Sequence, residues 1–184
     1  MPEYYATERA EQEEKERLMQ LVGFILGGEL FGVDILMVQE IIRSTGITHV
    51  PNAPDFVEGV INLRGNIIPV IDLRKRLNMT EEAPKPDQEK DWILILNIEG
   101  RTTGFIVDQV TEVLKIEEAE IEPPPEIIIS GLESQYILGV CDIGEQLLIL
   151  LDFNRILMVE EIRKLKEADM GARTTDSPSQ SGAE

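Results

Sequence analysis

The chain is poor in the residues on which many enzymes and metal proteins depend. Its 184 residues include one cysteine, Cys141, and one histidine, His49. A single thiol cannot form an internal disulfide, which is consistent with a reducing cytoplasm. Neither residue belongs to a metal-ligand pattern, and the sequence has no phosphate-binding loop, dinucleotide-binding motif or nucleophile elbow. We therefore expect a buried, inert Cys141, a surface His49, and no catalytic residues, metal or cofactor.

Basic residues and long apolar runs are also scarce. The chain has 17 Lys and Arg against 35 Asp and Glu, for a formal net charge of −18. Nucleic-acid binding requires clustered cations, and the short basic stretch at 73–77 is expected at a strand or helix end in solvent. No apolar run approaches the roughly 20 residues of a membrane helix. These absences argue against a nucleic-acid partner and against direct membrane insertion, and the acidic start of the chain is unlike a signal peptide.

Short apolar runs separated by turn residues predict a mainly β domain over residues 18–165. The strongest strand candidates are residues 20–28, 29–35, 92–100, 102–110, 136–143 and 146–153. Residues 34–43 fit a helix or a strand, and the apolar spacing in 154–170 predicts a C-terminal helix. Residues 1–17 form an acidic extension, predicted to be disordered or a frayed helix, and residues 166–184 a disordered tail.

The sequence contains an internal repeat. Residues 59–77 align without gaps on residues 139–157, with four identical pairs: Gly59/Gly139, Val60/Val140, Asp72/Asp152 and Leu77/Leu157. Residues 27–34 similarly resemble residues 99–108. The order in each half is hairpin, connector, hairpin, which predicts two similar small β-barrels in tandem. Asp72 and Asp152 end equivalent strands, and we expect them to share a capping role.

An arginine stands at one of the predicted hairpin turns. In Leu63-Arg64-Gly65-Asn66 the glycine and asparagine suit a tight turn, but the turn has no need of a guanidinium. In the second copy Gly144 lies opposite Arg64, so a turn of this kind closes without the arginine. Arg64 is therefore either a solvated surface residue or part of a functional site.

The segment 35–43 has two interpretations. As part of the core, Ile35, Val38 and Ile41 would point inward. As a binding surface, Val38 and Glu40 would lie on the same side of a strand, two residues apart. An apolar contact beside a carboxylate is typical of protein recognition.

Four segments together resemble the CheW family, the coupling proteins of bacterial chemotaxis: FGVDILMVQEI (31–41), ITHVPNAPDFVEGVINLRGNIIPVIDLR (47–74), WILILNIEGRTTGFIVDQVTEVL (92–114) and YILGVCDIGEQLLILLDFNRIL (136–157). The resemblance covers about residues 18–162. It implies an all-β fold of two five-stranded SH3-like barrels that share a hydrophobic interior, with a C-terminal helix. It also implies a non-catalytic adaptor between methyl-accepting chemoreceptors and the histidine kinase CheA.

The resemblance also implies partners, sites and a location. The tip of the receptor's cytoplasmic helical hairpin would contact Val38, Glu40, Gly59, Asn62, Arg64, Gly65 and Ile67. The regulatory domain of CheA, which has this same fold, would be the second partner, and a kinase or ring contact would involve Glu126 and Ile127. The protein would be cytoplasmic, at receptor arrays on the inner face of the membrane.

Two other classes of protein remain open from the sequence. The same fold occurs fused to the kinase or to a receiver domain, and neither added module fits within this chain, which favours a standalone adaptor. A small-ligand-binding barrel or an enzyme would need a polar constellation that the sequence does not show.

Overall fold

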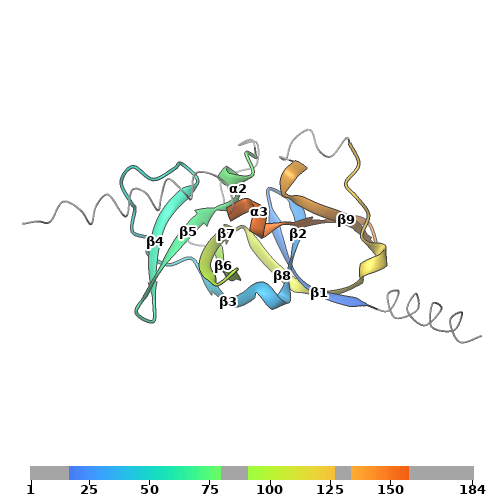
Figure 1. Ribbon diagram of the computed structural model, residues 1–184, viewed down its shortest axis with the longest axis horizontal. Coiled ribbons are helices and arrows are strands. Elements are labelled where there is room, and N and C mark those ends of the chain that lie inside the picture. Colours follow the sequence, from blue (N-terminus) through green and yellow to red (C-terminus); the bar gives the residue numbers. More distant parts are fainter. Residues whose placement is uncertain (1–16, 80–90, 127–133, 158–184) are drawn as a thin grey trace, which may run out of the picture.

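The computed structural model describes residues 17–79, 91–126 and 134–157 (Figure 1). Within these ranges the strands are β1 (Leu18–Leu26), β2 (Glu29–Asp34), β3 (Val38–Arg43), β4 (Val57–Leu63), β5 (Asn66–Asp72), β6 (Trp92–Ile98), β7 (Arg101–Val107), β8 (Gln109–Glu117), β9 (Ile137–Ile143) and β10 (Gln146–Leu151). The helices are α2 (Leu73–Arg76) and α3 (Phe153–Leu157), with 3₁₀ turns η1 (Ile35–Met37), η3 (Glu118–Glu120) and η5 (Ser134–Tyr136).

The strands form two five-stranded sheets. Sheet A has the order β8-β1-β2-β10-β9, and sheet B has the order β3-β6-β7-β5-β4. Each sheet curls until its two edges approach, and a single backbone bridge joins the chain at one edge to the strand at the other. The bridge is Glu122–Val140 in sheet A and Thr48–Val60 in sheet B. The predicted all-β class and its two five-stranded units are confirmed.

The two sheets do not follow one another along the chain as the order of the repeat suggested. The first hairpin of each half pairs with the strands of the other half: β1 and β2 join β8, β9 and β10, whereas β6 and β7 join β3, β4 and β5. The exchange pairs β2 with β10 and β5 with β7 as parallel neighbours, and β1 with β8 and β3 with β6 as antiparallel neighbours. Each barrel thus contains both halves of the chain, because similarity between two hairpins does not specify which strands they pair with.

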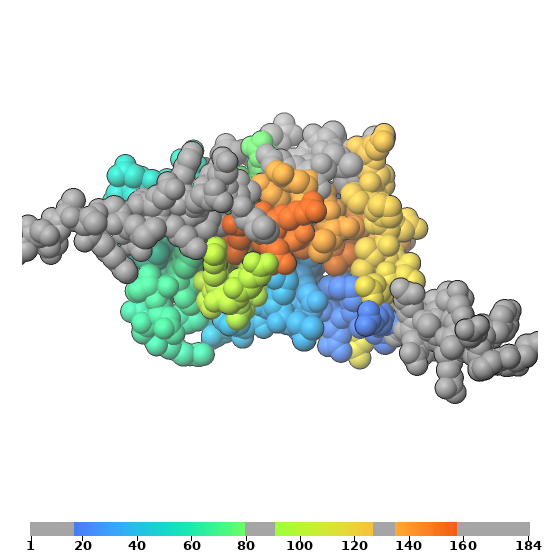
Figure 2. Space-filling model, in the orientation of Figure 1, coloured from blue at the N-terminus to red at the C-terminus, as the bar shows by residue number. Residues whose placement is uncertain are grey.

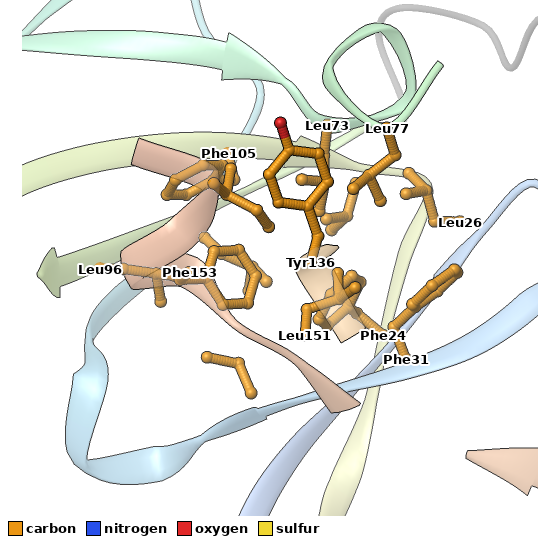
Figure 3. Close-up of a cluster of buried hydrophobic side chains, with 14 of the residues drawn as sticks. Phe24, Leu26, Phe31, Leu73, Leu77, Leu96, Phe105, Tyr136, Leu151 and Phe153 are labelled. Carbon is orange, nitrogen blue, oxygen red and sulfur yellow. The ribbon is translucent and has the colours of Figure 1, made fainter. Parts of the chain in front are cut away.

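Among the described residues, the buried apolar side chains form three clusters. Sheet A encloses Leu21, Leu30, Ile116, Cys141, Leu148 and Leu150, and sheet B encloses Ile61, Ile68, Val70, Ile93 and Ile95. The largest cluster draws side chains from both sheets and both helices, and its aromatic members include Phe24, Phe31, Phe105, Tyr136 and Phe153 (Figure 3). Phe153 of α3 packs against Phe105 of sheet B at 5.0 Å and Phe24 of sheet A at 6.4 Å, measured between ring centroids. The shared hydrophobic interior is therefore also confirmed.

A short helix follows the β4–β5 hairpin and another follows the β9–β10 hairpin, and an aspartate begins each. The Asp72 carboxylate accepts hydrogen bonds from the backbone N–H groups of Arg74 and Lys75, and Asp152 accepts one from the N–H of Arg155. Such caps satisfy N–H groups that have no partner within the helix. The predicted capping role of both aspartates is confirmed.

Other expectations had mixed outcomes. The ambiguous segment 34–43 is η1 followed by β3. The predicted C-terminal helix begins as α3, and its part beyond Leu157 lies outside the described residues, as do residues 1–16 of the acidic extension and the tail at 166–184. The basic stretch at 73–77 ends a strand as expected, but its placement in solvent is wrong for Leu73, Arg76 and Leu77, which are buried.

Candidate functional site

The turn between β4 and β5 holds Arg64 in an unusual backbone conformation. Arg64 has φ 53° and Gly65 has φ 86°, the left-handed pair that a two-residue type I′ hairpin turn requires. The side-chain oxygen of Asn62 accepts a hydrogen bond from the N–H of Gly65 at 2.9 Å. A residue with a Cβ atom is disfavoured in this region by about 1 kcal/mol or more. An arginine is therefore kept where glycine would be less strained.

Two other hairpins show what this turn needs for folding. In the β9–β10 turn, Gly144 occupies the place of Arg64, with φ 61°. In the β6–β7 turn, Glu99 and Gly100 repeat the two left-handed residues, and the Asn97 side chain accepts from the N–H of Gly100 at 2.9 Å. The asparagine and the second-position glycine recur in the β6–β7 turn with a glutamate in place of the arginine, and the β9–β10 turn closes with Gly144 and Glu145. The structure thus agrees with the prediction that the guanidinium of Arg64 is not required for the turn.

Arg64 forms an ion pair that spans the two edges of sheet B. Its Nη2 lies 2.9 Å from Oε1 of Glu40 on β3. The Arg64 side chain is 76% exposed and that of Glu40 is 29% exposed. An exposed pair of this kind adds at most about 1 kcal/mol to stability. Most of the guanidinium fork remains open to solvent and available to another molecule.

The strand that carries Glu40 begins with a bulge. Val38 pairs with Leu96 and Glu40 pairs with the adjacent Ile95, so β3 has one more residue here than β6. Val38 packs against the shared core, as does Ile35, and the core interpretation is correct for these two residues. Ile41, expected to point inward under that interpretation, is 36% exposed. In the structure Glu40 therefore contacts Arg64, whereas Val38 is partly buried against the core.

Apolar side chains of β5 and of η1 are also exposed. Ile67 on β5 pairs in register with the exposed Asn62 on β4 and is 65% exposed. Leu36 in η1 is 88% exposed, and its backbone N–H is held by the Asp34 carboxylate at 2.9 Å. Sequence reasoning missed Leu36, because it lies between two apolar residues, Ile35 and Met37, that pack against the core, and only the 3₁₀ turn directs it outward.

Gly59 allows the barrel edge to close beneath this surface. Its φ is 150°, and a Cβ atom at this position would lie 2.0 Å from the carbonyl oxygen of Thr48. That carbonyl accepts the N–H of Val60, and the Thr48 N–H donates to Val60 in return, both at 2.9 Å. A side chain at 59 is therefore excluded by the backbone that joins the two edges of sheet B.

We define the Arg64 surface as Glu40, Asn62, Arg64, Gly65 and Ile67. The hairpin that carries most of it projects at the lower left of Figure 1 and forms that corner of the molecular surface in Figure 2. An open cationic fork beside exposed apolar groups is suited to contact with another protein.

Residues expected to be inert are placed accordingly. Cys141 is buried, and burial, with a smaller contribution from the nearby carboxylate of Glu120, raises the pKa of its thiol. His49 is exposed. The described part of the chain contains no group of three or more potential metal ligands, and no helix within it is long and apolar enough to cross a membrane.

The second predicted contact lies elsewhere. Glu126 is exposed and follows the segment that Glu122 attaches to β9 of sheet A. Ile127 lies outside the described residues. Glu126 thus follows a segment joined to sheet A, whereas the Arg64 surface lies on sheet B.

Comparison with known proteins identifies relatives over most of the chain. Residues 20–161 match the model of the CheW-like domain. The chain is 38% identical over 147 residues to the chemotaxis protein CheW of Treponema pallidum, covering 79% of this chain and 86% of the relative. It is 40% identical over 139 residues to CheW of Klebsiella aerogenes, covering 76% and 81%.

A solved structure agrees with these matches. The crystal structure of the scaffolding protein TtCheW from Thermoanaerobacter tengcongensis superposes with a TM-score of 0.70 at 36% identity. The match covers 79% of this chain and 91% of the solved chain.

Proposed function

The chain belongs to the CheW family of chemotaxis scaffold proteins, and we propose on this basis that it is a non-catalytic adaptor that couples methyl-accepting chemoreceptors to the histidine kinase CheA. Its two partners are the tip of the receptor's cytoplasmic hairpin and the regulatory domain of the kinase. It acts in the cytoplasm, at receptor arrays on the inner face of the membrane.

The observation that carries this proposal is the strained, exposed arginine at the β4–β5 turn. Arg64 has φ 53° where its counterpart is Gly144, and backbone strain of this kind persists where it has a use. The guanidinium is a planar donor that binds carboxylates and carbonyl oxygens in a defined orientation. At the tip of the hairpin it is well placed to donate hydrogen bonds to a polar group on a receptor helix.

The apolar part of the Arg64 surface supports the same partner. A helical hairpin presents an apolar ridge, and recognition of such a ridge needs exposed apolar groups with a few polar ones to set orientation. Ile67, 65% exposed, supplies the first and the Glu40–Arg64 pair supplies the second. Val38 and Gly59 support this surface, Val38 from the core beneath β3 and Gly59 at the barrel edge.

The kinase or ring contact is proposed on sheet A, at Glu126 and Ile127. The exposed position of Glu126 supports this assignment. This kinase or ring contact would then lie on a different barrel from the receptor contact, which allows one adaptor molecule to hold two partners at once.

Substitution of Arg64 tests the proposal. We expect Arg64→Ala to change the free energy of unfolding by less than about 1 kcal/mol, because its ion pair is exposed. Receptor control of CheA, measured as kinase activity in reconstituted receptor–adaptor–kinase assemblies, should fall by about tenfold or more, because a charged contact is lost at the interface. Arg101→Ala is the matched control, since Arg101 is an exposed arginine beside another hairpin turn of sheet B.

The proposal is wrong if wild-type protein adds nothing to kinase control in these assemblies. The assignment of Arg64 alone is wrong if Arg64→Ala unfolds the protein while the folded fraction still couples normally.

A further inference from the structure

A buried arginine lies where the two copies of the repeat meet. In the ungapped alignment Arg76 corresponds to Ile156, and the two residues contact each other across the molecule. The Nε and Nη2 atoms of Arg76 each donate a hydrogen bond to the backbone carbonyl oxygen of Ile156, both at 3.1 Å. Since α2 follows sheet B and α3 follows sheet A, these two bonds join the ends of the two barrels.

Aromatic rings from both copies flank the guanidinium. The Arg76 Cζ atom lies 4.8 Å from the ring centroid of Phe56 and 4.9 Å from that of Tyr136. These rings also correspond in the repeat: the carbonyl of Phe56 accepts the N–H of Asp72, and the carbonyl of Tyr136 accepts the N–H of Asp152, both at 2.8 Å. Phe56 precedes β4 and Tyr136 precedes β9, so each barrel contributes one ring.

The arrangement is asymmetric for a physical reason. Arg76 is only 9% exposed, and a second buried arginine at position 156 would place two like charges together in a region of low dielectric. One arginine opposite one isoleucine avoids that repulsion. The planar fork of Arg76 fits the single carbonyl acceptor of Ile156 with two donors.

We propose that Arg76 is a positioning residue that fixes the orientation of one barrel relative to the other, and that receptor control of the kinase requires this fixed orientation. The inference rests on the function proposed above, in which the Arg64 surface lies on sheet B and the contact at Glu126 on sheet A. Much of the remaining contact between the barrels is apolar and has little directionality. The bidentate bond and the two flanking rings supply a defined geometry.

The variants separate positioning from simple core stability. Arg76→Met keeps an apolar side chain of similar length between the rings but removes both hydrogen bonds to Ile156. Arg76→Lys keeps the positive charge and loses the planar fork. Arg155→Met is the matched control, because Arg155 follows the cap of α3 as Arg76 follows the cap of α2, and its side chain is 64% exposed.

Two readouts are needed, and the first is the distance between the barrels. Spin labels at Arg101→Cys on sheet B and Lys115→Cys on sheet A, in a Cys141→Ala background, report it by pulsed electron resonance below the unfolding temperature. Both labelled positions are exposed. We expect a broader distance distribution for Arg76→Met than for wild type, an intermediate one for Arg76→Lys, and no change for Arg155→Met.

The second readout compares binding with coupling. Binding of the receptor tip and of the CheA regulatory domain, each measured alone, should stay within about threefold of wild type for Arg76→Met, because neither contact includes residue 76. Kinase control in the complete assembly should fall by about tenfold. Effects of this size are known for residues that contact neither ligand but alter the coupling between two sites. If Arg76→Met does not fold, Arg76→Lys carries the same comparison with a smaller expected loss.

Three results would overturn the inference while leaving the proposed function intact. They are an unchanged distance distribution, a broadened distribution with normal coupling, and a loss of coupling explained fully by weaker binding to one partner. Failure of the proposed function is seen separately, as absence of coupling by the wild-type protein itself.

Discussion

The β4–β5 and β9–β10 hairpins have the same framework and different tips. In both, a glycine near the start of the first strand lies against backbone, a bridge fixes the next residue, and an aspartate caps the helix that follows. At the tips, Arg64 and Gly65 form one turn, and Gly144 and Glu145 form the other. The framework is thus required by the fold, and the difference at the tip identifies the residue that the fold does not explain.

The two halves also differ in how tightly the shared framework is packed. At Gly59 a Cβ atom would lie 2.0 Å from the Thr48 carbonyl oxygen, and φ is 150°. At Gly139 the nearest atoms would be Cγ2 of Ile121 at 2.5 Å and the carbonyl oxygen of Glu122 at 2.9 Å, and φ lies outside the left-handed region. Equivalent glycines are therefore not equally constrained.

The largest expected effect is on this pair of glycines. Gly59→Ala should lower the free energy of unfolding by about 3 kcal/mol or more, because it adds a backbone clash to an unfavourable φ. Gly139→Ala should lower it by about 1 to 2 kcal/mol, because its φ is unstrained and its Cβ atom would lie farther from the nearest backbone atom, at 2.9 Å. Urea unfolding of both variants measures the difference. Equal losses would show that the two barrel edges are equivalent after all.

A smaller effect is expected at Asp91, just before the β6–β7 hairpin, which is the second copy of the β1–β2 hairpin. Gly32 and Gly104 are equivalent in the repeat, so their strand partners Gly23 and Ile95 are equivalent as well. By the same register, Asp91, just before β6, corresponds to Met19 of β1. Its Oδ1 atom is buried without a hydrogen-bond partner among the described residues. Burial, with repulsion from Asp108 and Asp72 outweighing attraction from Arg74, raises the pKa of Asp91 to about 6.

The sign of the pH dependence follows from this shift. Because the folded protein binds this proton more tightly than the unfolded chain, whose pKa is near 3.8, the contribution of Asp91 to stability is most favourable below pH 3.8 and is lost as pH rises through about 6. Asp91→Asn should therefore raise the free energy of unfolding at pH 7 by about 1 to 2 kcal/mol, allowing for solvent screening. The gain should shrink at pH 5. Urea unfolding at pH 5, 6 and 7 measures it, and a gain independent of pH would contradict the assignment.

Exchanging the turn residues compares the tips directly. Arg64→Gly should stabilise the protein by about 1 kcal/mol or less, because it relieves a left-handed arginine at the expense of backbone entropy. Gly144→Arg should destabilise it by about 1 kcal/mol for the converse reason. Only Arg64→Gly should reduce kinase control. Thermal unfolding measures the change in stability of both variants, and the kinase assay measures their coupling. A reduction of kinase control by Gly144→Arg would remove the functional distinction between the hairpins.

The smallest expected effect concerns the partner of Arg64. Glu40→Gln should change the free energy of unfolding by about 0.5 kcal/mol or less, because the ion pair is exposed. The twin hairpin has no arginine at its tip and so offers no counterpart to this pair. Urea unfolding in low and high salt measures the change, and a loss above about 2 kcal/mol would mean that the pair is structural.

Some features of the site followed from the sequence and others did not. The turn glycine, the capping aspartates and the dispensability of Arg64 for folding were all accessible, because they depend on local backbone chemistry that the repeat displays twice. The contact between Glu40 and Arg64, 24 residues apart, depends on closure of sheet B, which no local pattern reports. The exposure of Leu36 was not foreseen, and Arg76 was expected in solvent but is buried, because exposure at those positions is decided by distant neighbours.

The sequence by itself determined the strands, the turns, the helix caps and membership of the CheW family, since each depends on short-range residue patterns. Only the tertiary structure decided that the first hairpins are exchanged between the barrels and that Arg76 joins them. The physical reason is that two similar hairpins present nearly the same edge to a partner strand. Pairing is therefore selected by packing of the whole molecule around the shared core, a quantity that no single segment contains.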